Sequence, residues 1–119
     1  MRAYLVFFVT GPVDDALAAA LRDRLRLRAG AWAWAAASPG WFDDPSACEG
    51  EERTTGAYLR VEEADGVDVA DVDAMWEWVL GASGELMVSF EVQWREVPLG
   101  RIHQGRPDEG LMETLRGIA

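Results

Sequence analysis

Four side chains that could carry acid–base chemistry stand at even spacings in two segments expected to be strands. Tyr58 and Arg60 lie in residues 57–64, and Glu91 and Arg95 lie in residues 85–97. Side chains at even spacing share one face of a strand. A carboxylate or a Tyr/Arg pair beside an apolar cavity can move a proton without a cofactor. The same residues could equally form surface ion pairs with no function, and both interpretations stay open.

Aromatic residues suggest a second kind of site. Trp32 and Trp34 alternate with alanines in AWAWAA, a pattern typical of a strand with both indoles on one face. If that face is turned toward helices, the two residues are core; if it is open, they form part of a binding floor or an interface. Trp41 and Phe42 follow in a segment expected to be a loop, and we expect them to cover the open face of the sheet or to clamp a ligand.

The segment 38–56 is predicted to be a long acidic loop, because it is rich in proline and glycine. Its carboxylates could attract a basic protein partner. They lack the alternating spacing of a calcium-binding loop, so no metal site is expected. The candidate binding residues in this loop, besides Trp41 and Phe42, are Asp43, Asp44, Glu49, Glu51 and Glu52.

Other cofactor chemistry lacks the residues that it needs. The chain has one histidine, His103, and one cysteine, Cys48, so a single chain cannot build a Cys₄, Cys₂His₂ or His₃ zinc site. No serine stands in a GxSxG motif, and the acidic neighbours of Cys48 disfavour a reactive thiolate. Glycine-rich phosphate-binding motifs are also absent. We therefore expect no cofactor.

Negative charge is concentrated in the middle of the chain. The formal net charge is -10, and residues 43–91 hold 14 acidic residues against two arginines, a balance of -12. This charge disfavours binding to nucleic acid or to anionic lipid and favours a basic partner. No apolar run reaches the ~20 residues that cross a bilayer, and the single cysteine excludes an internal disulfide, so we expect a cytoplasmic protein. All 11 basic residues are arginines, which indicates a GC-rich genome such as that of an actinobacterium.

The hydrophobic pattern predicts four strands and two helices in the order β-α-β-β-α-β. The strands are expected at 3–10, 31–36, 57–64 and 85–97, and the helices at 14–30 and 68–84. Asp14 and Asp68 are the expected N-caps. The first strand is apolar on both faces, so either Tyr4 and Phe8 or Phe7 must be covered by the C-terminal tail, the 38–56 loop or another subunit.

This order predicts a single α+β domain of the split βαβ (ferredoxin-like) type. A four-stranded antiparallel sheet would carry both helices on one face, with the first and third strands in its centre. Residues 1–98 would form this core. Residues 99–119 would form a C-terminal extension that packs on the core and contains a possible short helix at 108–117.

Two functions follow from these observations. The first is a small acidic, non-catalytic binding protein that neutralises a basic protein partner, as an immunity protein or an inhibitor does. The alternative is a cofactor-free dimeric α+β barrel, either an enzyme of the monooxygenase or cyclase kind or a binder of a small apolar ligand. In that alternative the two copies would form a homodimer through the sheet face. An enclosed apolar cavity beside Tyr58 and Glu91 would favour the alternative.

Overall fold

The first strand, β1 (Arg2–Thr10), is central to the fold. In the computed structural model, which describes residues 2–35, 37–44, 54–62 and 66–118, alternate residues of β1 point to opposite faces. Ala3, Leu5 and Phe7 are at most 4% exposed. The residues between them lie on the other face, and they are more exposed. A strand with apolar residues on both faces belongs in the interior of a sheet.

In the part of the chain that the structure describes, the sheet has six antiparallel strands in the order β2-β3-β1-β4-β5-β6. They are β2 (Ala37–Asp44), β3 (Thr54–Glu62), β4 (Ser89–Trp94), β5 (Val97–His103) and β6 (Arg106–Pro107), together with β1. The α+β class is confirmed, but the expected number of four strands is wrong. β1 and β3 have neighbours on both sides, as expected. Residues after Pro98, expected to be a tail, continue the sheet because a two-residue turn at Arg95 and Glu96 reverses the chain.

The described residues form three helices, one more than the two expected to cover the sheet: α1 (Asp15–Ala31), α2 (Val69–Leu86) and α3 (Leu111–Gly117). The two predicted N-caps are confirmed, since Asp14 accepts the N–H of Leu17 and Asp68 accepts the N–H of Ala70, both at 2.8 Å. α3 corresponds to the possible short helix. α2 runs two residues into the segment predicted as a strand from 85, and it ends at Met87 in a left-handed conformation.

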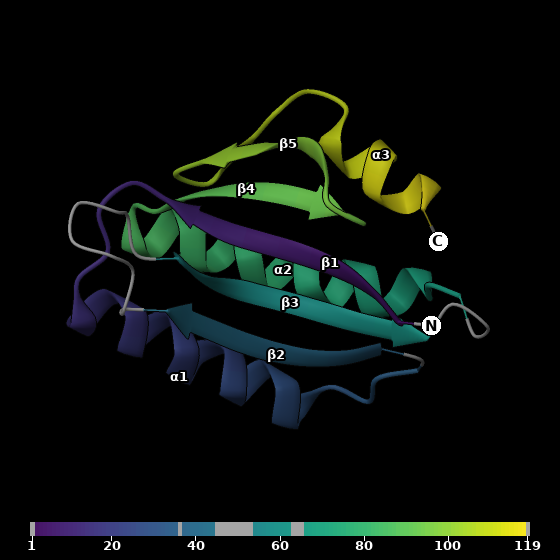
Figure 1. Cartoon of the computed structure of the whole chain (residues 1–119), viewed down its shortest axis with the longest axis horizontal. Coiled ribbons are helices and arrows are strands. Elements are labelled where there is room, and N and C mark those ends of the chain that lie inside the picture. Colours follow the sequence, from purple (N-terminus) through teal and green to yellow (C-terminus); the bar gives the residue numbers. More distant parts are fainter. Residues whose placement is uncertain (1, 36, 45–53, 63–65, 119) are drawn as a thin grey trace.

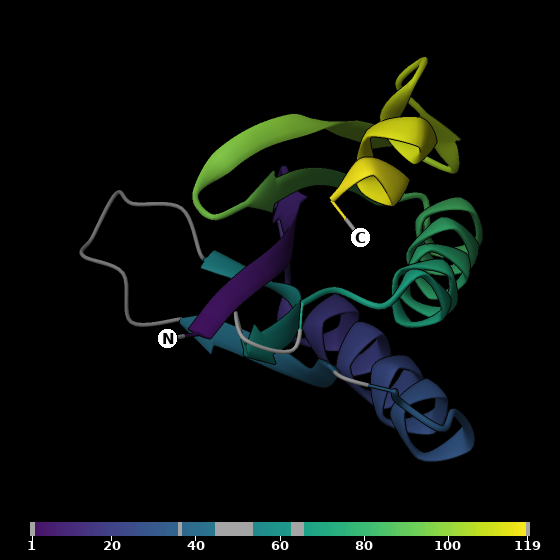
Figure 2. The same ribbon diagram turned by 90° about the vertical axis from the view of Figure 1, so that its right-hand side faces the viewer.

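All three helices lie on one face of the sheet (Figures 1 and 2). Their apolar residues pack on the inward-facing residues of the strands, among which Phe7, Phe90 and Val92 are fully buried. Salt bridges from Arg24 to Glu85, at 2.6 Å, and from Arg28 to Glu77, at 3.9 Å, join α1 to α2. In the part of the chain that is described, no helix lies on the opposite face, which is called the open face below. None of these helices is both long enough and apolar enough to span a membrane.

Two predictions about residues 31–56 are wrong. Residues 31–36 do not begin a strand, because α1 continues to Ala31 and the chain then turns toward β2. The buried carboxylate of Asp71 accepts the N–H groups of Ala35, at 2.8 Å, and Ala37, at 3.0 Å, which fixes the start of β2. Nor is 38–56 a single long loop, since β2 and the start of β3 lie within it. Proline and glycine are tolerated there because β2 is an edge strand.

Candidate functional site

The open face carries a cluster of aromatic rings over the half of the sheet formed by β2, β3 and β1. The rings belong to Tyr4 and Phe8 of β1, Phe42 of β2 and Tyr58 of β3. Ring centroids lie 5.7 Å apart for Tyr4 and Tyr58, and 5.3 Å apart for Phe8 and Phe42, both in edge-to-face geometry. Tyr4 is 42% exposed, and the other three rings are half-buried. These side chains form an apolar surface that the described residues leave open.

Two glycines hold the outer rings close to the backbone. A Cβ on Gly40 would lie 2.3 Å from the ring of Tyr58, and a Cβ on Gly56 would lie 3.0 Å from the ring of Phe42. Each ring therefore covers a glycine of the neighbouring strand, an arrangement that stabilises glycine within a sheet. As a result, the rings of Tyr58 and Phe42 lie close to the backbone of the sheet, and space remains above β1.

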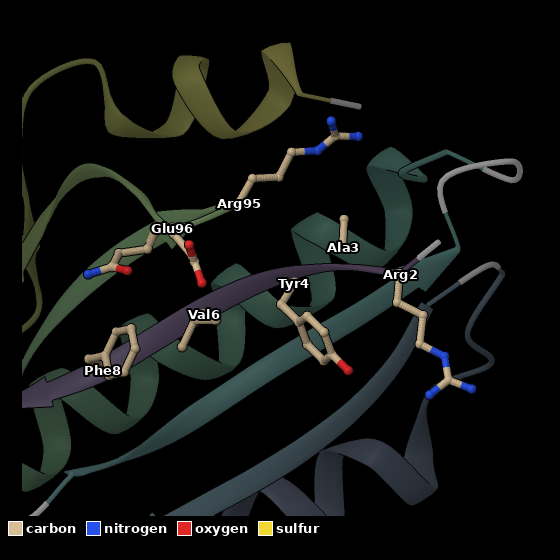
Figure 3. Close-up of a pocket in the computed structure, with 8 residues that line it drawn as sticks. Arg2, Ala3, Tyr4, Val6, Phe8, Arg95 and Glu96 are labelled. Carbon is tan, nitrogen blue, oxygen red and sulfur yellow. The ribbon is translucent and has the colours of Figure 1, made fainter.

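A groove of about 540 Å³ runs along β1 on this face (Figure 3). Tyr4, Val6 and Phe8 line its floor, and Gln93 lines one side. Arg2 lies at the N-terminal end of β1, and the turn residues Arg95 and Glu96 complete the lining of the groove. The volume lies within the range of small-molecule sites. A hollow of about 370 Å³ adjoins the groove over Phe42 and Tyr58.

Charges of both signs surround the apolar floor. Arg2 forms a salt bridge with Glu62 at 3.3 Å, and Glu91 lies 3.9 Å from Arg101. The side chain of Arg95 lies over the indole of Trp94, 5.3 Å from the ring centroid. Charged residues with described side chains on the open face and its rim include Arg2, Arg60, Arg95, Arg101, Arg106, Glu62, Glu91 and Glu96. This face therefore carries charges of both signs, although the whole chain carries -10.

The turn beside the groove has an uncommon backbone. Trp94 pairs with Val97, so Arg95 and Glu96 form a two-residue hairpin turn with φ values of 50° and 68°. Two positive φ values indicate a type I′ turn, which favours asparagine and glycine. Side chains other than glycine are disfavoured in this conformation, typically by about 1 kcal/mol or more. The chain nevertheless has two long charged residues there, and both line the groove.

The four residues expected to carry acid–base chemistry lie on or beside the open face, but they are spread over it: Arg95 lines the groove on β1, Tyr58 lines the hollow beside Phe42, and Glu91 lines a separate hollow near Arg101. Tyr58, Arg60 and Glu91 lie on the open face, and Arg95 lies in the adjoining turn. Glu91 accepts a hydrogen bond from the side-chain amide of Gln93 at 3.2 Å. A catalytic role for these residues stays a prediction.

The expected aromatic residues fall into separate places. Phe42 lies on the open face, as expected, but Trp41 lies on the opposite face beside Arg22, Leu25 and Arg26 of α1. This separation follows from the alternation of side chains along β2, which replaces the expected loop.

Trp32 and Trp34 are not on the sheet. Trp32 is the C-cap of α1 and is 36% exposed. Trp34 packs against the core, and its indole N–H donates to the carbonyl oxygen of Ala29 at 3.1 Å. Both residues therefore belong to the connection between α1 and β2.

Most of the expected acidic binding site lies outside the described residues. Asp43 is exposed on β2, and Asp44 ends that strand, but the side chain of Asp44 and residues Glu49, Glu51 and Glu52 are not among those described. Attraction of a basic partner by this segment stays a prediction. Within the described ranges, no three histidine, cysteine or acidic side chains are grouped so that they could hold a metal ion.

Sequence reasoning missed four residues of this face: Arg2, Val6, Glu96 and Arg101. The apolar first strand already indicated that both of its faces need cover. The turn at Arg95 and Glu96 gave no signal, because it contains neither glycine, proline nor asparagine. Comparisons of the chain with known protein families, with curated proteins and with solved structures found no match.

Proposed function

We propose that the chain is a binding protein for a small, planar, apolar molecule, held in the groove on the open face of the sheet. The observation that supports this function is the apolar floor of Tyr4, Val6 and Phe8, bordered by polar groups of three kinds. Binding sites for small molecules combine a mostly apolar lining with a few polar groups that orient the ligand.

The polar groups suggest how the ligand is oriented. Rings that lie edge-to-face leave aromatic surface on which a planar ligand can stack. Arg2 lies at one end of the floor, the carboxylate of Glu96 lies beside Val6, and the side chain of Arg95 extends away from the floor toward α3, with the side-chain amide of Gln93 along one side (Figure 3). A ligand with an apolar body and one anionic or hydrogen-bonding end fits this distribution of groups.

The proposal also covers the type of fold, the location in the cell and the capture of a basic partner. The order β2-β3-β1-β4 supports a split βαβ (ferredoxin-like) core, extended by β5 and β6. A cytoplasmic location stays an expectation. Capture of a basic partner also remains a proposal, and the salt bridges that join acids of α2 to arginines of α1 give it no support, since they compensate part of the negative charge.

Calorimetric titration with 1-anilinonaphthalene-8-sulfonate, a planar apolar anion, tests the proposed function. We compare the wild type with Val6→Trp, which fills the groove, and with Leu27→Trp, a matched change at a residue of α1 that is 76% exposed. Wild type and Leu27→Trp should bind the probe saturably with equal affinity, and Val6→Trp should bind at least about tenfold more weakly, because it occupies the space of the ligand. A wild type that does not bind, or a Val6→Trp variant with unchanged affinity, would falsify the proposal.

A further inference from the structure

We infer that the open face is an interface between two copies of this chain, and that a second copy encloses the groove. The role of the enclosed space rests on the proposed function, whereas the dimer is argued from the face itself. Three observations carry the inference: the size of the face, its balance of charge, and the incomplete enclosure of the groove.

The face is large enough for a stable dimer. β1 and β3 have nine residues each, and at about 3.4 Å per residue they span about 30 Å. Five strands, β2 to β5 in the sheet order, span about 20 Å at a spacing of about 4.8 Å. Because β2, β4 and β5 are shorter, with eight, six and seven residues, the flat area is about 500 Å². Side-chain relief adds to this area, which brings it toward the ~800 Å² that each partner buries in an interface of standard size.

The charge of the face favours a second copy over other occupants. A chain with a net charge of -10 repels another copy, and nucleic acid or anionic lipid as well. The open face and its rim carry both arginines and glutamates, so copies that meet there can pair opposite charges and experience little local repulsion. A basic partner would be drawn to the acidic surfaces elsewhere on the chain. Charges of both signs around an apolar centre also suit an interface in which the same surface meets itself.

The groove by itself is an incomplete site. Tyr4 is 42% exposed although it lines the floor, so a ligand lying there would keep its outer surface in water. Small-molecule sites usually bury about 70–90% of the ligand. A second sheet packed on the first would supply the missing wall from its own Tyr4, Val6 and Phe8, since two equivalent faces meet in such a dimer.

Sedimentation equilibrium of the ligand-free protein tests the dimer. At concentrations above about 10 µM the wild type should sediment with twice the chain mass of 13.1 kDa, because interfaces of this size dissociate in the micromolar range or below. Tyr4→Glu and Gln93→Arg, which place charges of opposite sign on the face, should each lower the association constant at least about tenfold. Leu27→Glu, on the helical side, should leave it unchanged. Far-ultraviolet circular dichroism checks that each variant is folded.

The outcomes separate this inference from the proposed function. A wild type that is monomeric throughout overturns the dimer, whether or not it binds the probe. A dimer that Tyr4→Glu and Gln93→Arg leave intact, although both variants are folded, assigns the interface to another surface and also overturns the inference. A dimer that both variants dissociate supports it even if the probe does not bind, and in that case only the proposed ligand site fails.

Discussion

Phe7 and Phe8 are neighbours in β1, but they lie in two different environments. Phe7 is fully buried between the sheet and the helices, whereas Phe8 is half-buried on the open face, in edge-to-face contact with Phe42. The same contrast holds along the strand from Arg2 to Phe8. One face of the sheet is covered by α1, α2 and α3, and the other face carries the rings and the groove.

The contrast separates residues that stabilise the fold from residues that are available to a ligand or a partner. On the covered face, apolar side chains fill space, and their loss leaves a cavity. On the open face, similar side chains are only partly buried in one copy, and Gly40 and Gly56 keep the surface low. A large apolar surface on a small protein typically marks a site of interaction.

Substitution of the two phenylalanines tests this separation most strongly. Phe7→Ala should lower the free energy of unfolding by about 3–5 kcal/mol, since it creates a cavity in the core. Phe8→Ala should lower it by only about 1 kcal/mol in the monomer, because the side chain is half-exposed there. Urea denaturation at low protein concentration measures both values.

The protein concentration then sharpens the comparison. If a second copy covers the open face, the loss in free energy of unfolding caused by Phe8→Ala should rise with protein concentration, because the lost side chain also contributes to the dimer. The cost of Phe7→Ala should not depend on concentration in this way. Equal losses for the two variants at low concentration would contradict the assignment of Phe8 to an open face.

The buried carboxylate of Asp71 gives the next largest effect. It accepts the N–H groups of Ala35 and Ala37, so Asp71→Ala removes the acceptor of two backbone groups. We expect a loss of about 2–4 kcal/mol in the free energy of unfolding. Asp73→Ala is the matched control on the same helix: the bond of Asp73 to Arg116 is exposed, and its loss should cost less than about 1 kcal/mol. Equal losses of stability for Asp71→Ala and Asp73→Ala would show that Asp71 does not anchor β2.

The sequence predicted the covered face better than it predicted the edge strand β2, the connection before it and the turn beside the groove. Period-2 alternation correctly placed Phe90 and Val92 on the core side of β4, and Val88 just before it in the core. The caps of both long helices were also predictable, since Asp14 and Asp68 precede clear helical patterns. What these predictions share is a local signal, either alternating hydrophobicity or a capping side chain.

The failures lie where tertiary contacts override local signals. Pro39 and Gly40 indicate a loop, but they lie in an edge strand, where a missing N–H is tolerated and the ring of Tyr58 covers the glycine. Trp32 and Trp34 alternate like strand residues, but α1 extends to Ala31 and the indole of Trp34 bonds back to that helix. For the candidate site, alternation placed Tyr58 and Glu91 correctly, and the hidden turn at Arg95 and Glu96 left the groove unrecognised.

The two hairpin turns of the C-terminal half provide the prediction with the smallest expected effect on stability. Gln104 and Gly105 form the turn between β5 and β6, with φ values of 51° and 87°, so only its first position carries a non-glycine side chain. Arg95→Asn with Glu96→Gly converts the other turn to the favoured Asn-Gly pair and should raise the free energy of unfolding by about 1 kcal/mol. The same double variant should bind anilinonaphthalene sulfonate several-fold more weakly, because it removes two of the side chains that line the groove. Gln104→Asn should stabilise the fold slightly and leave probe binding unchanged, since that turn lies outside the groove.

Thermal denaturation and calorimetric titration of the wild type and the two variants measure the effects on stability and on probe binding. If the double variant gained stability and kept full affinity, the side chains of this turn would have no part in binding, and the groove would be limited to the floor on β1.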